Sequence, residues 1–171
     1  QAHPDPNCVA PALQKSSLIY DVIDSSNGFY SNDVMDGQLG PLVGVLSSME
    51  WIIDNSKNYK WIMTFPCDTP FFKIEIIDQM MTAQRHSSKK LFFLKSCEKR
   101  HNIFGLWSIK LLDRLEKDLN DGERKVELWA NNVGVKTINM EFPNNDPFFN
   151  INTKEDLEKG YKTFTFLTGS V

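Results

Sequence analysis

The stretch KWIMTFPCDTP, residues 60–70, decides the fold class. Its first half is apolar almost throughout, which is typical of a buried strand, and Pro66 ends that strand because proline cannot continue the hydrogen-bond ladder. An acidic residue, Asp68, follows directly. We therefore expect a strand within a sheet, with Asp68 at the carboxyl edge of that sheet.

Strand and helix patterns alternate on both sides of this stretch. Short apolar runs predict strands at 18–23, 60–65, 91–94, 103–107, 135–140 and 148–151. Apolar residues at helical spacing predict helices at 41–54, 74–84, 109–119, 124–131 and 154–163, with buried stripes made by Leu42, Val45, Leu46, Met49 and Ile53 in the first and by Ile74, Ile77 and Met81 in the second. This order predicts an α/β protein, a single domain over residues 1–171 whose mostly parallel sheet has helices on both faces.

Composition excludes several classes of protein. The chain has 171 residues and a net charge of −3, so nothing draws it toward nucleic acid or an anionic membrane. Its three cysteines show no CxxC spacing, which argues against a zinc site or a disulfide framework and favours a reducing compartment. No apolar run reaches the length of a membrane span, and residues 1–7 do not resemble a signal peptide. We expect a cytoplasmic protein.

Asp68 is the first candidate for chemistry. Ligands of parallel α/β sheets bind outside the carboxyl ends of the strands, and a carboxylate there can hold Mg²⁺ against ligand phosphates. The alternative is a turn in which Asp68 bonds its own backbone and the flanking prolines fix the bend. Spacing alone favours the turn.

Two further segments are candidates for ligand contacts. Gly40 precedes an expected helix, so its backbone and the free N–H groups of that helix could approach a ligand, although a plain loop-to-helix junction looks the same. Asn150 and Asn152 would lie on one side of the expected strand end, where their amides could orient a metal-bound phosphate or a pterin edge. Both could instead only cap the following helix, in which Thr153 is a good N-cap and Asp156 completes a capping box.

Weaker signals come from two charged segments. Gly122-Glu123-Arg124-Lys125 is best explained as a solvated helix start. Arg100 and His101 precede an expected strand and either could contact an anionic ligand, but an exposed lone histidine usually has no special role.

Taken together, these segments resemble the molybdenum cofactor guanylyltransferases in order and spacing. The resemblance covers about residues 18–164 and is carried by GPLVG at 40–44, PCDTP at 66–70, GERK at 122–125 and NINT at 150–153 with Asp156-Leu157. The PCDTP stretch is the most specific element. Related cytidylyltransferases for the same cofactor usually carry a different aspartate loop, so the resemblance favours guanylyl transfer.

The resemblance implies a Rossmann-like nucleotidyltransferase fold and an enzyme that binds GTP with Mg²⁺. The molybdopterin phosphate would attack the α-phosphorus, release pyrophosphate and form the guanine dinucleotide form of the cofactor. Other cofactor-biosynthesis proteins and acceptor molybdoenzymes would be its protein partners. The implied site residues are Asp68 as magnesium ligand and Asn152 beside the metal or pterin, both catalytic, with Ser25, Asn27, Asp36 and Gly40 at the nucleotide and Arg100 and Asn150 at the substrate.

The sequence also departs from the family pattern. Members begin with a strand and a glycine-rich loop whose arginine and lysine wrap the GTP phosphates, and residues 1–17 show no such signature. Asn102 stands where the family often has a proline. We therefore expect the domain to lack its first strand and loop, and the 171-residue chain to bind GTP weakly. Transfer of another base or to another acceptor, or a catalytically inactive protein that binds pterin or nucleotide, are the alternative functions.

Overall fold

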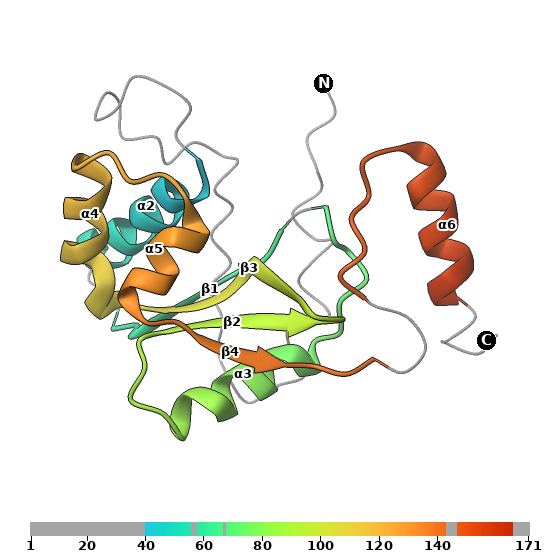
Figure 1. Cartoon of the computed structure of the whole chain (residues 1–171), viewed down its shortest axis with the longest axis horizontal. Helices are drawn as coiled ribbons and strands as arrows, with labels where there is room; N and C mark the ends of the chain where they lie inside the picture. Colours follow the sequence, from blue (N-terminus) through green and yellow to red (C-terminus); the bar gives the residue numbers. More distant parts are fainter. Residues whose placement is uncertain (1–39, 56–57, 67, 143–146, 166–171) are drawn as a thin grey trace.

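The computed structural model describes residues 40–55, 58–66, 68–142 and 147–165, and these form a sheet covered by helices (Figure 1). The sheet contains β1 (Trp61–Thr64), β2 (Leu91–Ser96), β3 (Lys99–Ser108) and β4 (Lys136–Asn139), in the order β1-β3-β2-β4. β3 pairs antiparallel with both β1 and β2, whereas β2 and β4 pair in parallel. It follows that β1, β2 and β4 all run in the same direction, so their carboxyl ends lie at one edge.

The expectation of a mostly parallel sheet is therefore confirmed for strand direction, since β1, β2 and β4 run the same way. It is wrong for strand pairing, since only β2 and β4 pair in parallel among the described strands. β3 is a reversed strand placed between two strands that run the same way. It returns directly from β2 through the two-residue turn Cys97-Glu98, at φ 46° and 61°, and left-handed values at both central positions are those of a type I′ hairpin. Such turns are usually built from asparagine and glycine, so the hairpin could not be recognised from these two residues.

The predicted helices are confirmed, with shifted ends. They are α2 (Gly40–Asp54), α3 (Glu75–Arg85), α4 (Leu112–Asn120), α5 (Val126–Val133) and α6 (Lys154–Thr165), and a 3₁₀ turn, η2 (Ile109–Leu111), precedes α4. The Ser108 hydroxyl accepts a hydrogen bond from the Lys110 N–H at the start of that turn. Among the described residues, no helix is long and apolar enough to cross a membrane.

The predicted strand at 148–151 is wrong. Residues 147–148 form a turn and 149–152 have no regular structure. The Ile151 N–H donates to the backbone carbonyl of Asp68 at 2.7 Å, outside any strand ladder. The segment is apolar because Phe148, only 4% exposed, enters the core, and not because it adds a strand to the sheet.

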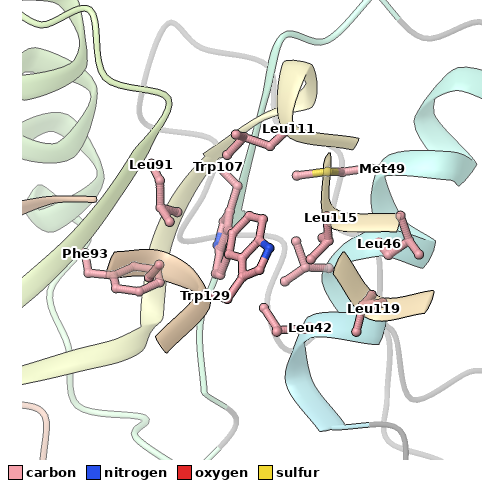
Figure 2. Close-up of a cluster of buried hydrophobic side chains, with 12 residues drawn as sticks. Leu42, Leu46, Met49, Leu91, Phe93, Trp107, Leu111, Leu115, Leu119 and Trp129 are labelled. Carbon is pink, nitrogen blue, oxygen red and sulfur yellow. The ribbon is translucent and has the colours of Figure 1, made fainter. Parts of the chain in front are cut away.

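Alternate residues of the strands point to opposite faces and form two cores. Leu91 and Phe93 of β2 join a cluster with α2, α4 and α5, whereas Phe92 and Leu94 join a cluster that includes α3. Figure 2 shows the first cluster, in which the ring of Trp107 lies against that of Trp129, with centroids 5.9 Å apart and planes 27° from parallel. Helices thus cover both faces, and the predicted α/β class is confirmed.

The two predicted helical stripes are confirmed at most positions and wrong at one end of each. In α2, the predicted residues up to Met49 are buried, whereas Ile53 is 53% exposed and Ile52 is buried in its place. In α3, Ile77 is buried as predicted, whereas Ile74, which precedes the helix, is 38% exposed. α2 packs against both α4 and β1, so the direction of burial is set by two neighbours that the spacing within one helix does not contain.

Candidate active site

Asp68 follows β1 and lies against a segment from the far end of the chain. The Asn150 side-chain amide Nδ2 donates to Asp68 Oδ2 at 3.1 Å, and the Ile151 N–H donates to the Asp68 carbonyl at 2.7 Å. The Thr69 hydroxyl donates to the Pro66 carbonyl at 3.1 Å, which closes the bend beside Asp68. The structure thus brings together two predicted site residues at the edge where the strands end, the usual ligand edge of such sheets.

Asn152 is held by a capping box at the start of α6, as the sequence predicted. The Asp156 carboxylate accepts hydrogen bonds from the N–H groups of Asn152 and Thr153 at 3.1 and 3.0 Å, and the Thr153 hydroxyl accepts from the Asp156 N–H at 3.0 Å. The bond from the Asn152 N–H is the main cause that lowers the pKa of Asp156 below its usual value. Capping therefore fixes the backbone of Asn152, and the residue as a whole is exposed.

A contact that the sequence did not reveal packs α6 against Phe71, three residues after Asp68. A Cβ atom at Gly160 would lie 2.3 Å from Phe71 Cε2, so only glycine allows this approach. The Phe71 ring also meets Tyr161 edge-on, with centroids 6.0 Å apart. A glycine inside a helical pattern was the available signal, since it often marks close packing. The contact helps to fix the relative position of Asp68 and Asn152.

Arg100 begins β3 and therefore lies at the same edge of the sheet, but its guanidinium is engaged with the protein. It donates to the side-chain oxygens of Asn102 at 2.8 Å, Asn131 at 2.8 Å and Glu127 at 3.3 Å. It also lies over the Phe93 ring at 5.9 Å. These contacts fasten β3 to α5, and the predicted substrate contact of Arg100 would have to compete with them.

Residues 122–125 connect α4 to α5, in agreement with their interpretation as a charged helix start. The Arg124 guanidinium donates to the Leu119 and Glu123 carbonyls at 2.6 and 2.7 Å. The Glu123 carboxylate accepts from the N–H groups of Arg124 and Lys125, both at 2.9 Å, in the segment that precedes α5. These bonds explain the charged segment without a ligand.

The remaining nucleotide residues are only partly placed. Gly40 opens α2 at φ 60°, exposed and with open space where a side chain would be, so a ligand could approach its backbone. Gly44 is also exposed, with open space where a side chain would be. Ser25, Asn27 and Asp36, with the strand expected at 18–23, lie outside the described residues, as does Cys67.

The described residues offer a magnesium ion few protein ligands. Among them no group of three or more His, Cys, Asp and Glu side chains could hold a metal. The carboxylate of Asp156, four residues after Asn152, is used in capping.

Comparison with known proteins agrees with this arrangement. Residues 28–133 match the model of a family described as the MobA-like NTP transferase domain. The molybdenum cofactor guanylyltransferase of Mesorhizobium japonicum is 31% identical over 140 residues, which are 80% of this chain and 67% of that protein. The protein of the same name from Rhizobium rhizogenes is 33% identical over 133 residues, which are 73% of this chain and 60% of the relative.

Solved structures share the fold at low sequence identity. Molybdopterin-guanine dinucleotide biosynthesis protein A from Archaeoglobus fulgidus superposes with a TM-score of 0.55 at 16% identity, covering 77% of this chain and 64% of that one. A protein from Aquifex aeolicus gives a TM-score of 0.54 at 19% identity, covering 67% and 57%. The chain spans 60% of the Rhizobium rhizogenes relative and 57% of another from Nitrobacter hamburgensis. With its sheet, its two helical layers and its match over residues 28–133, the chain belongs to the MobA-like NTP transferase family.

Proposed function

We propose that this protein transfers GMP from GTP to the phosphate of molybdenum-molybdopterin, releasing pyrophosphate and forming the guanine dinucleotide form of the cofactor. Family membership and the names of the relatives support this function. The observation that carries it is the 3.1 Å bond between Asn150 and Asp68, which joins the two segments that resemble the guanylyltransferases at the ligand edge of the sheet.

The reaction consists of one exchange at phosphorus. An oxygen of the molybdopterin phosphate forms a bond to the α-phosphorus of GTP, the bond from that phosphorus to the bridging oxygen breaks, and the electron pair leaves with pyrophosphate. Such transfers depend mainly on positioning and charge neutralisation. The protein must therefore hold two polyphosphorylated ligands in line and offset their negative charge.

Asp68 fits the role of a magnesium ligand. A carboxylate has two oxygens and about four acceptor positions, so the bond from Asn150 leaves room for a cation. Mg²⁺ is usually held by one or two carboxylates together with substrate phosphates, which suits a site with one carboxylate. When bound, the ion would neutralise phosphate charge, while Asn150 holds the orientation of the Asp68 carboxylate.

The partners that follow from this function are GTP and molybdopterin, then other cofactor-biosynthesis proteins and the molybdoenzymes that receive the product. A cytoplasmic location is part of the same proposal. Neither nucleic acid nor a membrane is required by it.

A comparison of nucleotides tests the proposal. The full-length protein would be incubated with molybdopterin, Mg²⁺ and either GTP, CTP or ATP, with pyrophosphate release and product mass as readouts. We expect product with GTP at a rate at least tenfold above CTP and ATP. Equal use of another base would support the alternative nucleotidyltransferase, and ligand binding with no product would support the inactive binding protein.

An Asn152→Ala substitution separates the two ligands. We expect it to raise the KM for molybdopterin severalfold while the KM for GTP changes little. The reason is the place of the exposed Asn152, which lies between the Asp68–Asn150 contact and the start of α6. Thr153→Ala is the matched control, since it removes the cap hydroxyl and should cost about 1 kcal/mol of stability without this selectivity. Equal loss for both ligands together with lowered stability would leave Asn152 a capping role only.

A further inference from the structure

A partly buried hydrogen bond crosses the β2–β3 hairpin beside the candidate site. Ser96, only 2% exposed, ends β2, and its Oγ lies 2.7 Å from His101 Nε2 on β3. This contact holds one nitrogen of the imidazole and so restrains the orientation of the ring.

The ring of His101 in turn supports the segment that carries Asn150. Its centroid lies 4.4 Å from that of Phe148, with the two planes 38° apart. The ring centroid of Phe148 also lies 4.5 Å from that of Phe104 and 5.5 Å from that of Phe142, so His101 is one of the aromatic side chains that surround the buried Phe148. Phe148 stands two residues before Asn150, and two residues of chain reach at most about 7 Å, so the position of Phe148 limits where the Asn150 backbone can lie.

We propose that His101 is a positioning residue for the candidate active site. Held by Ser96, it fixes Phe148 and thereby places the Asn150 amide on the Asp68 carboxylate. The inference rests on the proposed function for its effect on catalysis. Its structural half, the coupling of His101 to Asn150, stands on the contacts alone.

A histidine serves here because it combines two properties. Its ring packs at a tilt against that of Phe148, and its nitrogen accepts or donates the bond to Ser96. Leucine would remove both contacts. Ser96→Ala would remove the hydrogen bond and keep the ring of His101, and it is the milder variant if His101→Leu does not fold.

The first test is a double-mutant cycle on guanylyl transfer by the full-length protein. We expect His101→Leu and Asn150→Ala each to lower kcat by about tenfold or more, since small misplacements of reacting groups are costly. The double variant should be no slower than the slower single variant, because both substitutions remove the same contribution to the rate, the correctly placed Asn150 amide. Additive losses would overturn the proposal.

The second test needs no activity and so separates failure of this inference from failure of the proposed function. The side-chain NH₂ signals of Asn150 are assigned in ¹⁵N spectra by their loss in Asn150→Ala, and they should shift in His101→Leu and in Ser96→Ala. Ser108→Ala is the matched control, a buried serine that bonds the Lys110 N–H at the opposite edge of the sheet. Asn150 signals that stay in place in both His101→Leu and Ser96→Ala would overturn the inference, whatever the enzyme assay shows.

Discussion

An Asp68→Asn substitution is expected to lower guanylyl transfer by at least about a hundredfold while it leaves the thermal midpoint nearly unchanged. The change removes the charge that would hold Mg²⁺ beside the phosphates, and the loss of one preorganised electrostatic contact typically costs a factor of 10²–10³ in rate. An asparagine oxygen can still accept the bond from Asn150, and the bond from the Ile151 N–H goes to the backbone of residue 68. Both folded-state contacts therefore survive.

The measurement is the initial rate of pyrophosphate release as a function of Mg²⁺ concentration, with thermal unfolding of the same samples. Asp113→Asn is the charge-matched control, because Asp113 is exposed in the first turn of α4, at the edge of the sheet opposite the candidate site. We expect the control to keep its rate. Normal activity in the Asp68 variant would remove this residue from the site.

The sequence predicted the parts of the fold that local patterns determine. The strand at Trp61–Thr64 and the capping box of Thr153 and Asp156 both depend on residues within a few positions of one another, and both are confirmed. The β2–β3 hairpin was not predicted, because Cys97-Glu98 carries no glycine or asparagine although both residues adopt left-handed φ values. Pairing across the hairpin, and not the turn residues, must stabilise those values.

The candidate site was predictable only in part, for a related reason. Asp68 was found from its place after a strand, but its partner Asn150 is 82 positions away, and no local pattern joins the two. Phe148 made residues 148–151 look like a strand, whereas its apolar side chain is required by the core beside His101. The resemblance to a family supplied the link between the two segments, and the structure supplied the contact.

Arg100 shows the opposite limit. Its charge and its place before a strand favoured an anionic ligand, yet three side chains on β3 and α5 accept its hydrogen bonds. Side-chain type and position cannot distinguish an arginine that binds a phosphate from one that fastens a strand to a helix. Only the structure, which shows the hydrogen-bond partners of the guanidinium, distinguishes the two roles.

A Gly105→Ala substitution is expected to destabilise the fold by about 2 kcal/mol, the largest stability effect that we predict. Gly105 lies in β3 opposite Phe93 and Thr64, and a Cβ atom there would lie 2.5 Å from Trp107 Nε1 and 2.8 Å from Phe93 Cε1. Both rings are fully buried and cannot move aside freely. Overpacking of this kind costs about 1–3 kcal/mol, and it outweighs the 0.5–1 kcal/mol or so that alanine gains over glycine in a strand.

Displacement of the Trp107 ring would also break its hydrogen bond to the Thr64 hydroxyl, now 2.9 Å long, and leave a buried indole N–H without that acceptor. For a chain of this size, about 2 kcal/mol corresponds to a fall of roughly 4–8 °C in thermal midpoint, measured by circular dichroism. Gly44→Ala is the matched control, because its Cβ would enter open space on α2 and alanine favours a helix by up to about 1 kcal/mol. A midpoint that rises in both variants would mean that the sheet beside Trp107 adjusts to the added methyl group. The close approach at Gly105 would then not be what holds the rings of Trp107 and Phe93 in place.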